Sequence, residues 1–235
     1  MTSVKKIFAD IVSKLVPRIR YMVPAYSSEG EDLILKRIFD SKTNGVYVDV
    51  GAHHPFRVSN TYLFYKKNWT GINIDPMPGS QVLFNKYRPL DINLEIGVSA
   101  TRQHLTYYIF NETALNTFST DKVKEYTEGS KYHVIKEQQI ETWPLADILD
   151  YYLPLGTNID FLTIDAEGLD MEVLRSNNWK KYRPSYILVE LNPFLLSNMQ
   201  NSEIGKYMEE AGYVIFAKTY YTYFFKNMKS ENRNE

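Results

Sequence analysis

The sequence contains no cysteine. Disulfides, thiolate nucleophiles and zinc–thiolate sites are therefore excluded, and the absence fits a reducing compartment. An excess of one charge is also missing, because 27 Lys and Arg residues face 28 Asp and Glu residues. No dense basic stripe of the kind that binds nucleic acid occurs. No apolar run approaches the roughly 20 residues that span a bilayer, and residues 1–24 carry neither the long apolar segment nor the cleavage site of a secretory signal. We therefore expect a cytoplasmic protein with no transmembrane segment and no nucleic-acid partner.

The most informative stretch runs from Gly45 to Pro55. Its residues Val46 to Val50 alternate β-branched and aromatic side chains, and Gly51 ends the apolar run. Ser59-Asn60-Thr61 then opens an amphipathic segment. This order is typical of a strand, a tight glycine turn and a helix N-terminus. Such a turn lets a ligand approach the backbone closely, and the helix offers free N–H groups.

A second apolar segment, Gly71 to Asp75, ends in an acid. In a nucleoside-binding sheet, an acid after the second strand accepts hydrogen bonds from the ribose hydroxyls. Dinucleotide enzymes need two further glycines after the first one, for the pyrophosphate and for helix packing, whereas Gly51 is followed by Ala, two His and Pro. A cofactor without a pyrophosphate does not require those glycines. The pattern therefore favours a methyltransferase that binds S-adenosylmethionine over a dinucleotide enzyme.

Strand-like and helix-like segments alternate along almost the whole chain. This alternation predicts an α/β fold with a mostly parallel seven-stranded sheet, helices on both faces and a C-terminal antiparallel hairpin. We expect one main domain over residues 26–228, with a third strand over 91–99 and a polar tail at 229–235. Residues 101–133 include a long polar stretch without a strong period, which predicts an excursion or lid over the site.

Residues 1–25 predict a basic amphipathic helix, because apolar residues recur at helical spacing and Lys and Arg occupy the other side. The simplest interpretation is a helix that packs on the flank of the domain. Residues 1–24 are also a candidate for peripheral contact with a membrane surface or for the interface of a homo-oligomer.

Polar side chains fall at the predicted carboxyl ends of the strands, where ligands of parallel sheets bind. They are Asp49 with Gly51, Asp75, Asp165 with Glu167, and Glu190 with Asn192. Oxygen ligands from neighbouring strands suit a hard cation, so Asp165, Glu190 and Asn192 are candidate ligands for Mg²⁺, which would activate a hydroxyl group. The alternative is that these three residues only hydrogen-bond the substrate or the loop N–H groups.

Five segments of the sequence match a known family. They are Val48–Ala52, Ser59–Thr61, Trp69–Asp75, Ile159–Gly168 and Val173–Leu174. With them, over about residues 26–225, the chain resembles the FkbM family of S-adenosylmethionine-dependent methyltransferases. The resemblance implies a Rossmann-like class I methyltransferase fold and methylation of a hydroxyl group. It extends to the polysaccharide-associated branch through the His-His-Pro turn and Ala114–Thr117.

The resemblance, together with the strand-tip positions, implies a cofactor site and a catalytic site. The cofactor-binding residues it implies are Asp49, Gly51, His53, Ser59, Asn60, Asp75, Ser99 and Asp165. Asp49 and Gly51 would border the methionine end of S-adenosylmethionine, and Asp75 its ribose, while Ser59 would also cap a helix. The catalytic residues are predicted to be Asp165, His53 and Glu190.

One position departs from the family pattern. Many members carry a histidine directly after Glu-Gly, and this sequence has Leu169 there. His53 and His54 therefore become the candidates for the general base, with His53 ranked first, because imidazole titrates near neutral pH. The alternative for either residue is a turn histidine that hydrogen-bonds the backbone or touches the cofactor without chemistry.

Together these features predict an O-methyltransferase that acts on a sugar or nucleotide-sugar hydroxyl in bacterial surface polysaccharide biosynthesis. Two alternatives remain open: a methyltransferase for a small non-sugar metabolite, and a non-catalytic binding module that keeps the fold.

Overall fold

The computed structural model describes residues 9, 10, 12, 22–191 and 196–228. Most of the predicted N-terminal helix at 1–25, the predicted tail at 229–235 and the candidate ligand Asn192 lie outside the described residues. None of the helices formed by the described residues is long and apolar enough to cross a membrane.

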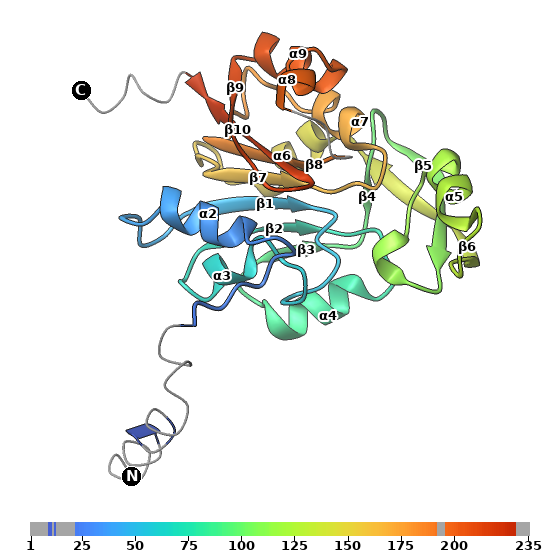
Figure 1. Ribbon diagram of the computed structural model, residues 1–235, viewed down its shortest axis with the longest axis horizontal. Coiled ribbons are helices and arrows are strands. Elements are labelled where there is room, and N and C mark those ends of the chain that lie inside the picture. The colour runs from blue at the N-terminus through green and yellow to red at the C-terminus, as the bar shows by residue number, and fades with distance from the viewer. Residues whose placement is uncertain (1–8, 11, 13–21, 192–195, 229–235) are drawn as a thin grey trace.

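The centre of the fold is a seven-stranded sheet (Figure 1). Its strands are β1 (Val46–Val50), β2 (Thr70–Ile74), β3 (Ile92–Leu94), β7 (Phe161–Ile164), β8 (Tyr186–Glu190), β9 (Tyr213–Lys218) and β10 (Thr222–Asn227). They lie in the order β3-β2-β1-β7-β8-β10-β9. The first five are parallel to one another, and β10 runs antiparallel to β8 and β9. The predicted Rossmann-like α/β class, with its C-terminal antiparallel hairpin, is confirmed.

Helices cover both faces of this sheet and bury an apolar core on each. The helices are α2 (Glu31–Ile38), α3 (Tyr62–Tyr65), α4 (Ser80–Tyr87), α6 (Leu145–Tyr152), α7 (Asp170–Arg175), α8 (Leu196–Met199) and α9 (Glu203–Glu210). On one face α2 and α3 pack with Tyr47 and Phe161, and on the other α6, α7 and α9 pack with Val48 and Val50. Successive residues of β1 therefore point to opposite faces, as the pleat of a strand requires.

A second sheet of three strands stands beside the first one and was not predicted (Figure 1). Its strands, in the order β4-β6-β5, are β4 (Gly97–Val98), β5 (Gln103–Phe110) and β6 (Val134–Trp143). The expectation of one strand over 91–99 is wrong, because β3 pairs with β2 in the large sheet whereas β4 pairs with β6 in the small one. The polar segment between β5 and β6 forms a 3-10 turn, η2 (Thr113–Leu115), and the helix α5 (Thr120–Thr127).

A buried polar network lies beneath β1. The fully buried Arg88 donates from Nε to the Asp91 carboxylate at 2.8 Å and from Nη2 to the Tyr47 hydroxyl at 2.6 Å. Its Nη1 donates to the Thr61 hydroxyl at 3.0 Å, and that hydroxyl donates to Asp49 at 2.6 Å. The guanidinium thus links the side chains of Tyr47 in β1 and Thr61 at the start of α3.

Replacing this guanidinium is expected to cost much of the stability of the domain. Arg88→Met removes the cation but leaves Asp91 buried, which lowers the free energy of unfolding by about 3–5 kcal/mol. Urea denaturation at pH 7 measures the change. The control is Arg37→Met, at an exposed ion pair, for which we expect a change within about 0.5 kcal/mol. Equal effects of the two substitutions would contradict the role of the network.

Candidate active site

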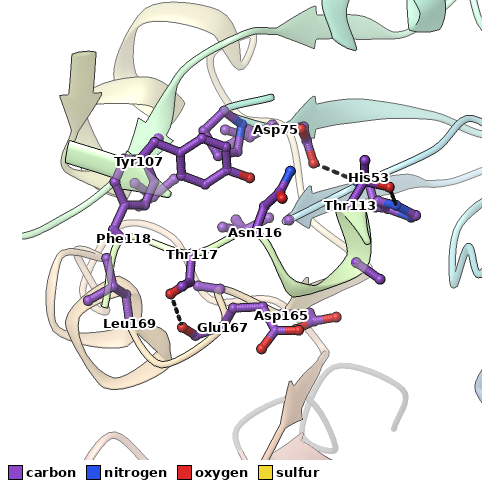
Figure 2. A pocket seen from close by; sticks show the side chains of 18 of the residues that line it. His53, Asp75, Tyr107, Thr113, Asn116, Thr117, Phe118, Asp165, Glu167 and Leu169 are labelled. Atoms are coloured by element: carbon purple, nitrogen blue, oxygen red, sulfur yellow. Dashed lines mark hydrogen bonds between the residues drawn. The ribbon is translucent and has the colours of Figure 1, made fainter. Parts of the chain in front are cut away.

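A cavity opens at the carboxyl ends of β1, β2 and β7, where ligands of parallel sheets bind (Figure 2). It encloses about 760 Å³, counting its open mouth. Gly51 and His53 line it from the turn after β1, Asp75 from the end of β2 and Asp165 from the end of β7. Four of the predicted site residues are therefore brought together.

Gly51 lets two strand ends approach closely. Its φ is +82°, in the left-handed region, and a Cβ built on it would lie 1.8 Å from the carbonyl oxygen of Asp165. No side chain fits in that space. The glycine therefore allows the turn after β1 to lie this close to the end of β7.

Asp75 presents a buried carboxylate to the cavity. Its Oδ2 accepts the backbone N–H of His53 at 2.7 Å, and its Oδ1 accepts that of Met77 at 2.8 Å. Burial raises the pKa of Asp75 to about 6, although the two N–H groups favour the charged form. Each carboxylate oxygen retains a lone pair for a further donor, so the group can accept two ligand hydroxyls.

The two histidines of the first turn differ in their surroundings. His53 lines the cavity with φ +52°, and its Nε2 lies 3.1 Å from the Thr113 hydroxyl. Burial and the nearby charge of Arg57 lower the pKa of His53, so the imidazole is neutral near pH 7. His54 instead accepts the backbone N–H of Arg57 at 3.2 Å and does not line the cavity. Its contacts are those of a turn histidine.

The segment between β5 and β6 lies over the cavity (Figure 2). Thr117 donates its hydroxyl to the backbone oxygen of Glu167 at 2.7 Å, and the Tyr126 hydroxyl donates to the Glu167 carboxylate. Asn116 and Tyr107 complete this wall. None of Tyr107, Asn116, Thr117 and Tyr126 was predicted as a site residue, although the excursion over residues 101–133 that carries them was expected to cover the site. Glu167 was predicted at the end of its strand.

A second cleft adjoins the cavity and shares Asp165 and Glu167 with it. It encloses about 1190 Å³, counting its open mouth, and Glu190 and Asp170 also line it. Asp165 and Glu190 hydrogen-bond each other, so the two carboxyl groups share a proton. Burial, followed by the charges of Glu190 and Glu167, holds the pKa of Asp165 well above its usual range. Burial also raises the pKa of Glu167, to about 7.

Comparison with known proteins now decides the family. The family model described as "Methyltransferase FkbM domain" matches residues 49–215, well over half of the chain. The chain belongs to the FkbM methyltransferase family. Membership implies S-adenosylmethionine as the methyl donor. No curated protein matches the chain. Among solved structures, the TehB-like SAM-dependent methyltransferase from Corynebacterium glutamicum is similar with a TM-score of 0.41 and 9% sequence identity, over 97% of this chain and 100% of that one.

Several predicted cofactor residues of this FkbM-family chain do not line the cavity. Asp49 bonds to Thr61, and burial raises its pKa to about 6. Ser59 accepts the N–H of Tyr62 at 3.1 Å, which supports the start of α3 as a cap would. The remaining two are also engaged with protein groups: Asn60 donates to Thr163, and Ser99 bonds to Thr101 and Thr142. All four side chains are therefore hydrogen-bonded within the protein.

The departure at Leu169 is visible in the geometry. Leu169 lines the cavity with an apolar side chain, where many FkbM members carry a histidine.

Among the described residues, no group of three or more His, Cys, Asp or Glu side chains is placed to hold a metal ion. The predicted magnesium ligands Asp165 and Glu190 contact each other, and the third, Asn192, lies outside the described residues. The magnesium site stays a prediction.

Proposed function

We propose that the chain transfers the methyl group of S-adenosylmethionine to a hydroxyl group of a sugar during the assembly of bacterial surface polysaccharide. One observation carries the proposal: Asp165 and Glu167 belong both to the cavity that Gly51 and Asp75 line and to the adjoining cleft. A donor in the first and an acceptor in the second would meet at these two carboxyl groups. The polysaccharide setting rests on the resemblance of the first turn and of Ala114–Thr117.

The lining of the cavity favours one orientation of the donor. Asp75 would accept the ribose hydroxyls, and the apolar wall made by Ile96, Val98 and Phe118 would cover the adenine. The methionine end would then point toward Gly51 and Asp165. When bound, S-adenosylmethionine supplies a methyl group on a positively charged sulfur, ready for attack by an aligned oxygen.

Asp165 and Glu190 would handle the proton of the acceptor. An alcohol is a poor nucleophile at neutral pH and needs a positioned base. Asp165 faces both cavities, whereas Glu190 lines only the acceptor cleft. During methyl transfer, Asp165 would take the proton of the acceptor hydroxyl, and the proton that it shares with Glu190 would move to Glu190. His53 faces only the donor cavity and is the second candidate for the base.

The charge of the cleft favours an acceptor without phosphate. Carboxyl groups line it in excess, against the single cation Lys122 among its described residues. The acidic residues are Glu125, Asp165, Glu167, Asp170 and Glu190. Carboxylates accept hydrogen bonds from sugar hydroxyls but repel a diphosphate. A glycan sugar or simple glycoside is therefore favoured over a nucleotide-linked sugar.

The direct test is methyl uptake from S-adenosylmethionine, followed by mass spectrometry over a panel of acceptors. Glycosides and oligosaccharides are expected to gain one methyl group at oxygen, and matched sugar phosphates and nucleotide-sugars to react at least tenfold more slowly. Uptake only by small non-sugar metabolites would favour the alternative enzyme. Failure to bind S-adenosylmethionine would leave only a binding module.

Donor binding is expected to depend on pH through Asp75. Because the pKa of this carboxyl group is raised to about 6, the charged acceptor for the ribose is lost below pH 6. The Kd for S-adenosylmethionine should rise by up to about tenfold per pH unit between pH 6 and 4, measured by calorimetry. Asp75→Asn should remove this dependence and weaken binding at pH 8 by about 10- to 100-fold. An unchanged Kd in the variant would contradict the ribose assignment.

Removal of divalent metal ions by a chelator distinguishes two roles of Asp165 and Glu190: sharing a proton and binding magnesium. If Asp165 and Glu190 act by sharing a proton, turnover should be unchanged after dialysis against EDTA. Loss of turnover that Mg²⁺ restores would instead support the site of Asp165, Glu190 and Asn192. The assay is run at saturating donor, so that a change in donor affinity does not enter.

A further inference from the structure

A third cavity lies at the amino ends of the parallel strands, whereas the donor cavity lies at their carboxyl ends. It is formed where β1, β7 and β8 begin and where the antiparallel β10 ends, and it encloses about 1070 Å³, counting its open mouth. Lys42, Thr157 to Asp160, Lys180 to Arg183, Ser185 and Asn227 line it. These residues precede the parallel strands, whereas the proposed catalytic residues lie at their carboxyl ends. The length of the strands therefore separates the two regions.

Positive charge dominates this third cavity. Lys42, Lys180, Lys181 and Arg183 line it, and Asp160 is the only acidic residue among the lining side chains that the structure describes. Lys42 pairs with Asp160, and Lys181 pairs at 2.7 Å with Asp150, which stands outside the lining. The whole chain has a formal charge of −1, so this concentration of cations does not reflect the overall composition.

Two of these cations have no carboxylate partner in the described part of the chain: Lys180 and Arg183. The Arg183 guanidinium donates to the neutral oxygens of Trp179, Ala211 and Asn227 at 3.0–3.1 Å. These contacts fix its plane without neutralising its charge. Its Nε is buried and has no hydrogen-bond partner. Proteins bind phosphate groups with such an arrangement, in which a guanidinium is fixed by neutral hydrogen-bond acceptors, has no carboxylate partner and lies beside lysines.

We propose that this third cavity binds a phosphate-bearing ligand, with Lys180 and Arg183 as its main contacts. The site is separate from methyl transfer: its ligand is bound at the far edge of the sheet and neither gives nor receives the methyl group. An oxyanion there would supply the missing negative charge and offset the mutual repulsion of the lysines. The phosphate could belong to a soluble compound or to a lipid headgroup, and the two sources are distinguishable.

The probe for the soluble form is pyrophosphate, titrated calorimetrically into the full-length protein at low ionic strength. We expect one site per chain, and about tenfold weaker binding in Lys180→Gln and in Arg183→Gln. The matched control is Lys136→Gln, an exposed lysine on β6 outside all three cavities, which should bind like the wild type. Saturating S-adenosylhomocysteine should leave the Kd for pyrophosphate unchanged, because the donor cavity lies at the other edge.

Vesicles of phosphatidylglycerol and of phosphatidylcholine test the lipid source by co-sedimentation. Binding to the anionic vesicles alone, lost in Lys180→Gln but not in Lys136→Gln, would assign the phosphate to a lipid headgroup. Pyrophosphate binding without vesicle binding would assign it to a soluble ligand. The proposal is overturned if neither probe binds, or if Lys180→Gln and Lys136→Gln bind both probes equally. Neither result depends on methyltransferase activity.

Discussion

Asp165→Asn is expected to lower kcat by about 10²- to 10⁴-fold while the Kd for S-adenosylmethionine changes by less than about threefold. Asparagine has the shape of a protonated aspartic acid, and its amide can donate a hydrogen bond to Glu190. The wall shared by the two cavities is therefore kept, and only the exchangeable proton is removed. Single-turnover assays and donor calorimetry measure the two quantities separately.

Glu190→Gln tests the other half of the same proton path. If Asp165 passes its proton to Glu190, the two residues act as one unit, and the double variant should be no slower than the slower single variant. The control is Glu128→Gln, an exposed residue directly after α5 and outside the cleft, which should retain turnover within about threefold. A fully active Asp165→Asn enzyme would show that the base is elsewhere, and His53→Gln would then be the next variant to examine.

Gly51→Ala is expected to abolish donor binding, with a Kd raised by at least about 100-fold. The added Cβ would lie 1.8 Å from the Asp165 carbonyl oxygen, so the first turn or the end of β7 must move. Such a movement displaces His53 and Asp165 together, and with them both ends of the cavity. Donor calorimetry measures the loss, and circular dichroism shows whether the sheet persists.

A second glycine separates this clash from simple backbone strain. Gly156 has φ +79°, close to the +82° of Gly51, but a Cβ there would meet nothing within 4 Å. Gly156→Ala should therefore lose only about 1–2 kcal/mol of stability, from the left-handed backbone, and bind the donor normally. Equal donor binding by the two alanine variants would contradict the proposed role of Gly51.

The core of the site was predictable because it depends on local pattern and on one topological rule. The strand, glycine turn and strand-tip acids of residues 46–75 follow from periodicity, and parallel strands bring their carboxyl ends to one edge. The same periodicity also explains why Asp49 does not line the cavity. Side chains of β1 alternate between faces, so Asp49 shares the face of Tyr47 and joins the Arg88 network, whereas Val50 lines the cavity.

The second sheet and the wall it carries depend on contacts between residues far apart in the sequence. Glu95 and Ile96 continue the apolar alternation of residues 91–99, and no glycine or proline marks the point where β3 ends. The pairing of Gly97 with Thr142 and of Val98 with Trp143 takes β4 into the other sheet. The contacts of Thr117 and Tyr126 with Glu167 likewise span 50 and 41 residues, so no local pattern predicts them.

A crystal structure with S-adenosylhomocysteine tests the central claim most directly. We predict both ribose hydroxyls within about 3 Å of the Asp75 carboxylate, and the sulfur directed at Asp165 across the wall shared by the two cavities. A nucleoside bound away from Asp75, or a sulfur that faces away from Asp165, would contradict the proposed arrangement of donor and acceptor.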